Sequence, residues 1–207
     1  MVVLHYTAME SCAAALERLC DPEIEVSAHY VIAESGEVFE LVDEDMRAWH
    51  AGSGSWGRVT DVNSHSVGIE LANAGSLANF PPFPEPQMAA LEQLLANILN
   101  RWEISPERVI AHSDMAPDRK ADPGTKFDWQ RLARGGLSVW PERHGKVAEE
   151  DFRSLARAFG YSAVVDEAAL LSAFRLRFRP GHNGPTDADD LAIIADLAAR
   201  YPAGPAT

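Results

Sequence analysis

The sequence predicts an α/β fold, in which a mixed central β-sheet flanked by helices is followed by a small domain of three helices. Over residues 1–140, short apolar stretches of strand length alternate with helical stretches, which is typical of a sheet covered by helices. The pattern changes at residues 140–146, and three amphipathic helical stretches then follow one another. We therefore predict two domains, residues 1–140 and residues 147–203.

Apolar stretches define the predicted sheet. The first is continuously apolar, as in a strand that is buried on both faces. Two others flank a short polar segment that contains Gly36, which predicts a hairpin. The predicted strands are residues 2–6, 28–33, 38–42, 66–72 and 108–111.

The most regular helix is predicted at residues 85–102, where apolar residues recur every three or four positions and form one stripe. The stripe consists of Met88, Leu91, Leu95, Ile98 and Trp102. The other predicted helices are residues 11–19, 127–133, 148–159, 167–178 and 187–200. Glycine, proline and polar residues predict loops at residues 48–62, 73–86 and 112–126.

Composition excludes several classes of function. A formal net charge of -13 repels the phosphates of nucleic acids and disfavours docking on an anionic membrane. No run of 18 apolar residues is present, so we predict no membrane-spanning segment. Cys12 and Cys20 lie about 12 Å apart on one predicted helix with a rise of ~1.5 Å per residue, too far for a disulfide. We expect free thiols and a monomeric protein.

The N-terminal residues give an expectation about the compartment. Residues 1–7 lack the basic head and long apolar stretch of a signal peptide, so the sequence as written predicts a cytoplasmic protein. A core strand that begins at residue 2 is unusual, because chain termini tend to fray. If an upstream segment is missing, we expect the periplasm or the face of the outer membrane instead.

Three residues form a candidate metal site. A lone histidine is more often a hydrogen-bonded residue than a metal ligand, but His5 and His112 each end an apolar strand, where sheet proteins place their sites. Asp122 lies in a polar loop stiffened by Pro117 and Pro123. Two imidazoles and one carboxylate suit a catalytic zinc ion with a fourth position open to water. We predict one Zn²⁺ per chain.

Glu70 and Lys120 are the candidate catalytic residues. Glu70 lies inside a buried strand, where it is either a general base or a carboxylate that is solvated or paired with an arginine; the residues leave both open. Lys120 precedes Asp122 by two positions, so it faces the same site if the loop is extended. There it would stabilise an oxyanion, whereas without the aspartate it would be a solvated lysine. We assign Trp49, His50 and Arg119 to substrate binding.

Several motifs together resemble one known family. They are residues 3–8 (VLHYTA), 26–30 (VSAHY), 47–52 (RAWHAG), 66–71 (SVGIEL), 109–117 (VIAHSDMAP) and 119–124 (RKADPG). In this order they resemble the zinc N-acetylmuramoyl-L-alanine amidases of the AmpD and AmiD type, which are relatives of the peptidoglycan recognition proteins. The resemblance covers residues 1 to about 140. The C-terminal residues resemble the three-helix peptidoglycan-binding module that follows AmiD-type domains.

The resemblance implies a reaction and residue roles. His5, His112 and Asp122 fall on the zinc-ligand positions of the family, Glu70 on its catalytic glutamate and Lys120 on its catalytic lysine. The expected reaction is hydrolysis of the amide between N-acetylmuramic acid, or its 1,6-anhydro form, and L-alanine of the peptidoglycan stem peptide. The expected partner is therefore peptidoglycan or a muropeptide. Two rivals stay open: a recognition protein that binds wall peptide without cutting it, and a general zinc peptidase.

Overall fold

The computed structural model describes residues 1–142 and 151–203, and its centre is a five-stranded sheet in the order β3-β2-β4-β1-β5. Strands β1, β4 and β5 are parallel, β2 is parallel to β4, and β3 pairs with β2 in an antiparallel hairpin. The mixed sheet is therefore confirmed. The strands are β1 (Val2–Tyr6), β2 (Tyr30–Ile32), β3 (Val38–Glu40), β4 (Val67–Leu71) and β5 (Val109–Ala111).

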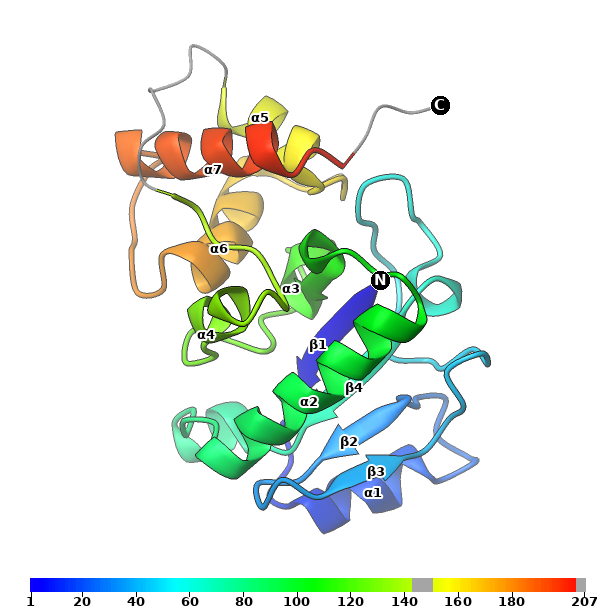
Figure 1. The fold of residues 1–207 in the computed structure, drawn as a ribbon. Coiled ribbons are helices and arrows are strands. Elements are labelled where there is room, and N and C mark those ends of the chain that lie inside the picture. Colours follow the sequence, from blue (N-terminus) through cyan, green and yellow to red (C-terminus); the bar gives the residue numbers. More distant parts are fainter. Residues whose placement is uncertain (143–150, 204–207) are drawn as a thin grey trace.

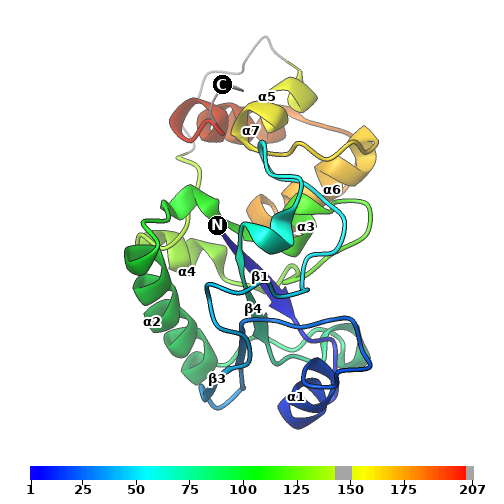
Figure 2. The ribbon, with the colours of Figure 1, turned by 90° about the vertical axis from the view of Figure 1, so that its right-hand side faces the viewer.

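Successive side chains along each strand point to opposite faces of the sheet, and the two faces pack against different helices. Val2 and Leu4 belong to a buried cluster with Leu91 and Leu95 of helix α2 (Glu85–Arg101), so this face lies under α2. Helix α4 (Trp129–Arg134) adds Trp129 and Leu132 to the same cluster. Helix α1 (Cys12–Leu19) lies on the other side of the sheet (Figures 1 and 2). The sheet is thus flanked by helices, as the sequence predicts.

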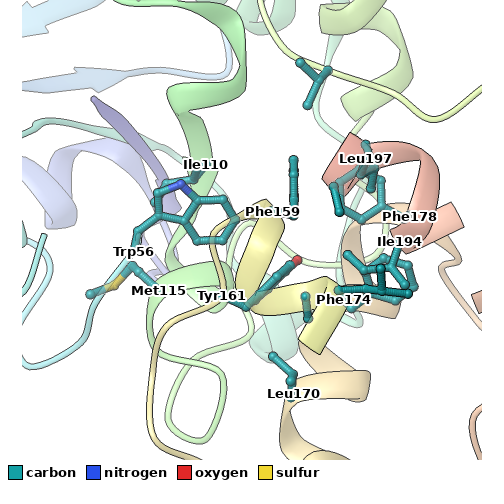
Figure 3. Close-up of a cluster of buried hydrophobic side chains, with 14 of the residues drawn as sticks. Trp56, Ile110, Met115, Phe159, Tyr161, Leu170, Phe174, Phe178, Ile194 and Leu197 are labelled. Carbon is teal, nitrogen blue, oxygen red and sulfur yellow. The ribbon is translucent and has the colours of Figure 1, made fainter. Parts of the chain in front are cut away.

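The predicted C-terminal helices are present as α5 (Phe152–Phe159), α6 (Glu167–Phe178) and α7 (Ala188–Arg200). Each begins after an aspartate whose carboxylate accepts a backbone N–H of the first turn, a strong start signal. Their facing apolar stripes meet in the buried cluster of Figure 3. Residues 148–150 of the first predicted helix lie outside the described residues, as do residues 143–146 of the predicted linker.

The cluster in Figure 3 also contains side chains from the N-terminal part of the chain. Ile110 of β5, Met115 and Trp56 belong to the same buried cluster as the aromatic residues of the C-terminal helices. The Trp56 ring lies edge-on to Phe159 and Tyr161, with centroids 5.4 and 4.9 Å away. The three helices therefore share one hydrophobic core with the far side of the sheet.

One predicted loop is wrong in part. Residues 112–126 were expected to be irregular, but His112–Met115 forms a single helical turn, α3. Asp114 stabilises this turn, because its carboxylate accepts the backbone N–H of Ala111 at 2.9 Å. A four-residue helix is too short to produce a periodic apolar pattern, so the sequence alone gives no sign of it. No helix among residues 1–142 and 151–203 is long and apolar enough to cross a membrane.

Candidate metal centre and active site

Three predicted ligands meet at one end of the parallel strands. The Nδ1 atoms of His5 and His112 lie 2.9 Å apart, and Asp122 Oδ2 lies 3.1 Å from the first and 3.0 Å from the second. His5 comes from the end of β1, His112 starts α3 directly after β5, and Asp122 comes from the following loop. Among the described residues, these three form the group that could hold a metal ion.

The spacing of the three atoms fits a tetrahedral zinc ion. With bonds of about 2.0–2.1 Å, neighbouring ligand atoms of such an ion lie roughly 3.3 Å apart. The distances of 2.9–3.1 Å found here need to widen by only a few tenths of an ångström. The donor set, two imidazole nitrogens and one carboxylate oxygen, leaves a fourth position for water or substrate.

Hydrogen bonds on the far side of each imidazole ring fix which nitrogen of the histidine faces the centre. His112 Nε2 lies 2.9 Å from the carbonyl oxygen of Ala51, so that nitrogen carries the proton and Nδ1 is free to bind a metal. His5 Nε2 lies 3.0 Å from His50 Nδ1, which accepts a hydrogen bond from it when Nε2 carries the proton. His50 Nε2 in turn lies 3.3 Å from Ser66 Oγ. Both ligand histidines are therefore held in one tautomer.

Burial sets the charges of the centre. It lowers the pKa of His5 to about 4, assisted by neighbouring His112 and opposed by Asp122. Burial raises the pKa of Asp122, but the neighbouring His112 and His5 outweigh it and hold that pKa well below its usual range. A neutral His5 imidazole and an ionised Asp122 carboxylate are the protonation states that bind metals.

Glu70 lies beside His5 on the adjacent strand β4. Its Oε2 atom is buried and has no hydrogen-bond partner among residues 1–142 and 151–203. Burial raises the pKa of Glu70 to about 8, with Asp122 adding to the rise and Lys120 opposing it. A divalent cation at the centre would oppose the rise as Lys120 does. Of the two interpretations left open by the sequence, this position beside the ligands favours the general base.

A cavity of about 430 Å³ opens over the centre. Lys120 and Arg119 line it, and so does Trp49, a residue that is 55% exposed. Arg119 is also tied to the loop that follows Trp49, because its guanidinium donates to the carbonyl oxygens of Ala51, at 3.2 Å, and Ser53. The predicted catalytic cation, Lys120, and the predicted substrate-binding cation, Arg119, thus line the same cavity as the three candidate ligands.

His50 lies differently from the other predicted substrate-binding residues. It touches the cavity, but it is buried, and its two ring nitrogens face His5 and Ser66. Its backbone N–H and that of Ala51 donate to Asn63 Oδ1 at 3.1 and 2.8 Å. This geometry favours a role in orienting His5, and direct substrate contact by His50 stays a prediction. Asn63 and Ser66 were not singled out as functional residues, because a single polar residue carries no pattern.

Comparison with known proteins agrees with this geometry. The N-acetylmuramoyl-L-alanine amidase family matches residues 1–125, which hold all three candidate ligands, Glu70 and Lys120. The chain belongs to this family. It is 35% identical to the N-acetylmuramoyl-L-alanine amidase AmiD of Escherichia coli K12, over 97% of this chain and 83% of AmiD. The family resemblance seen in the sequence is confirmed.

The family also includes shorter relatives. The 1,6-anhydro-N-acetylmuramyl-L-alanine amidase AmpD of Escherichia coli K12 is 36% identical over 53% of this chain and 57% of AmpD. The chain thus resembles AmiD over nearly its whole length and AmpD over about half of it.

Solved structures agree with both the fold and the C-terminal helices. The complex of E. coli AmiD with anhydro-N-acetylmuramic acid-L-Ala-D-γ-Glu-L-Lys superposes with a TM-score of 0.87 at 35% identity, covering 97% of this chain and 89% of AmiD. AmpDh3 from Pseudomonas aeruginosa with anhydromuramic pentapeptide also gives 0.87 at 35% identity, covering 98% and 92%. Drosophila PGRP-SA, at 19% identity and a TM-score of 0.51, shares the fold alone.

Proposed function

We propose that this chain is a zinc-dependent amidase that hydrolyses the bond between N-acetylmuramic acid, or its 1,6-anhydro form, and L-alanine of peptidoglycan stem peptides. The observation that carries the proposal is the convergence of His5, His112 and Asp122 beside Glu70 at the floor of one open cavity. The similarity to AmiD and AmpDh3, whose complexes contain anhydromuramyl peptides, supports this class of substrate.

The three ligands would hold one Zn²⁺ per chain. Bound there, the ion would act as a Lewis acid toward the amide carbonyl and lower the pKa of water. The outer hydrogen bonds to Ala51 and His50 keep the two imidazoles oriented before any metal arrives, which limits the reorganisation that binding costs.

Glu70 moves the proton in the proposed reaction. Its carboxylate accepts a proton from the attacking water, whose oxygen forms a bond to the amide carbon. The same carboxyl then gives that proton to the L-alanine nitrogen as the C–N bond breaks, so a free carboxylate on the sugar side and a free amine are released. A carboxyl whose pKa is raised by burial suits both halves of this transfer.

Lys120, Trp49 and Arg119 complete the proposed site. Lys120 carries a positive charge at the cavity and would stabilise the oxyanion of the tetrahedral intermediate. The exposed ring of Trp49 offers an apolar surface to the sugar or the peptide, and Arg119 offers a charge to a stem-peptide carboxylate.

Mass spectrometry of the products from purified muropeptides, with and without a strong chelator, tests the proposal. We expect release of the intact stem peptide with a free L-alanine amine, lost on chelation and restored by Zn²⁺. His5→Ala should lose both zinc and turnover, whereas His65→Ala, at an exposed histidine outside the cavity, should keep both. Binding without cleavage would favour a recognition protein, and cleavage of ordinary peptides at a similar rate would favour a general peptidase.

A further inference from the structure

The C-terminal helices reach the metal centre through one buried carboxylate. Asp114, the third residue of α3, is fully buried. Its Oδ1 accepts the hydroxyl of Tyr161 at 2.7 Å, and its Oδ2 accepts Arg177 Nη1 at 2.6 Å. Tyr161 follows α5 and Arg177 lies on α6, so both partners come from the C-terminal helices. They are 47 and 63 residues away in sequence.

The same carboxylate fixes the turn that carries a metal ligand. Asp114 Oδ2 also accepts the backbone N–H of Ala111, the last residue of β5 and the N-cap of α3. His112 comes next in the chain, and the direction of its side chain depends on how α3 leaves the strand. Asp114 therefore sets the start of the helical turn from which His112 reaches the centre.

Arg177 is held firmly enough to orient Asp114. Its Nη2 donates to the carbonyl oxygen of Val109 at 3.2 Å and to Ser138 Oγ at 3.1 Å. Its guanidinium carbon lies 4.1 Å from the centroid of the Trp129 ring. A buried carboxylate without such a partner would pay a large desolvation cost, so the pair is needed wherever Asp114 stays charged.

We propose that Tyr161 and Arg177 are positioning residues for His112. Through these two side chains, the C-terminal helices help to orient a ligand of the metal centre. Neither side chain touches the cavity or a ligand, so each acts through Asp114. The inference rests on the proposed metal site, and it gives the C-terminal helices a part in the chemistry that is separate from any binding of cell wall. A mutation at Tyr161 or Arg177 would then weaken metal binding.

The test uses the full chain with Tyr161→Phe, which removes one hydroxyl and keeps the ring in its aromatic contacts. The matched control is Leu197→Ala, which damages the same buried cluster on α7 without touching Asp114. Competition with a chelator gives the Zn²⁺ affinity of each purified protein, and thermal unfolding gives its stability. We expect Tyr161→Phe to weaken zinc binding about tenfold, as outer partners of metal ligands do. The control should lose stability but keep its zinc affinity.

A second measurement separates this inference from the proposed function. In metal-free protein, the ring N–H of His112 that donates to Ala51 gives an NMR signal that reports the orientation of the imidazole. We expect the signal to shift in Tyr161→Phe and to stay in place in Leu197→Ala. If the unmutated chain binds no zinc, the metal site is wrong, and this signal alone decides the positioning role.

Arg177→Lys is the stronger variant, because a lysine cannot reach both Asp114 and the Val109 carbonyl. It should weaken zinc binding further than Tyr161→Phe does. The inference is overturned if zinc affinity and the His112 signal of Tyr161→Phe match those of the unmutated chain. It is also overturned if the Leu197→Ala control changes both as much, since the helices would then only stabilise the fold.

Discussion

His5 and Glu70 are register partners on the parallel strands β1 and β4, so a backbone ladder sets the spacing between a candidate metal ligand and the candidate base. Their side chains point to the same face because partners in register share the phase of the pleat. Loop motion cannot separate them without breaking the sheet, so a conservative change at one position should leave the other in place.

Glu70→Gln tests whether Glu70 acts as the base while the metal site beside it stays intact. Glutamine keeps the shape of the side chain but cannot accept a proton, so we expect full zinc content and a fall in turnover of about 10²–10⁴-fold. Metal analysis and steady-state kinetics on muropeptide measure the two quantities. Glu17→Gln, at an exposed position on α1, is the control and should change neither. A loss of zinc in Glu70→Gln would instead make Glu70 a ligand or a structural residue.

Lys120 and Arg119 are neighbouring cations with different proposed roles. Lys120→Ala should lower kcat more than it raises KM, because an oxyanion contact forms only in the transition state. Arg119→Ala should mainly raise KM, because it removes a charge that binds substrate. Kinetics over a range of substrate concentrations separate the two parameters. If the two variants change kcat and KM in the same proportion, the division of roles is wrong.

Gly68 leaves the space that the His50 ring occupies. A Cβ atom at residue 68 would lie only 2.3 Å from His50 Cγ, so Gly68→Ala must displace the ring that accepts from His5. We expect Gly68→Ala to lower the free energy of unfolding by about 1–3 kcal/mol, as overpacking does, and to weaken zinc binding. In a His50→Ala background the same change should cost much less, because the ring is gone. Equal costs in both backgrounds would show that the strain arises elsewhere.

The sequence predicted elements that have strong local signals. The first and last residues of β1 and α6 were predicted correctly. Strand β1 is a continuous apolar run, and α6 begins after Asp166, a strong N-cap. The single turn of α3 was missed because nothing local distinguishes it from a loop. The ligands were found because two of them end apolar strands, and because several motifs together resembled a known family.

Relationships between distant parts of the chain were not predictable in this way. The contacts of Asp114 with Tyr161 and Arg177 join residues that are 47 and 63 positions apart, and no pattern of spacing predicts which buried polar groups pair. The hydrogen bonding of His50 to the ligand His5 was not predicted for the same reason, since the partners of its ring are the distant His5 and Ser66 side chains. The assignment of residues 1–140 and 147–203 to separate domains stays a prediction, although side chains from both share one buried cluster.

Asp187 links stability to pH. It caps α7, accepts from Arg179 and His182, and its pKa is held well below the usual range by the backbone N–H of Asp190 and by Arg179. A depressed pKa stabilises the fold above the unfolded pKa of ~3.9, and that contribution is lost as pH falls through the native pKa. Asp187→Asn keeps a capping side chain without the charge. We expect it to lower the melting temperature at pH 7 and to converge with the unmutated chain in acid. A constant difference at every pH would exclude the linkage.

The predicted wall binding by the C-terminal residues can be tested without truncation. A chain ending near Pro141 would expose Ile110, Met115 and Trp56, which the helices cover, so a loss of activity would not identify its cause. A cavity of about 780 Å³ between α6 and residues 181–186 offers a more selective target. Ser172 is exposed at this cavity, and Ser172→Arg would fill it with a long side chain.

We expect Ser172→Arg to weaken binding to insoluble sacculi several-fold and to leave turnover of soluble muropeptide unchanged. A second contact raises the local concentration of the enzyme on a polymer, but it does nothing for a diffusing fragment. Ala158→Arg, exposed on α5 outside the cavity, adds the same charge and serves as the control. Co-sedimentation with sacculi and a soluble-substrate assay measure the two effects. If Ser172→Arg and Ala158→Arg bind sacculi equally well, this cavity does not bind the wall, because filling it would then have no effect beyond that of the added charge.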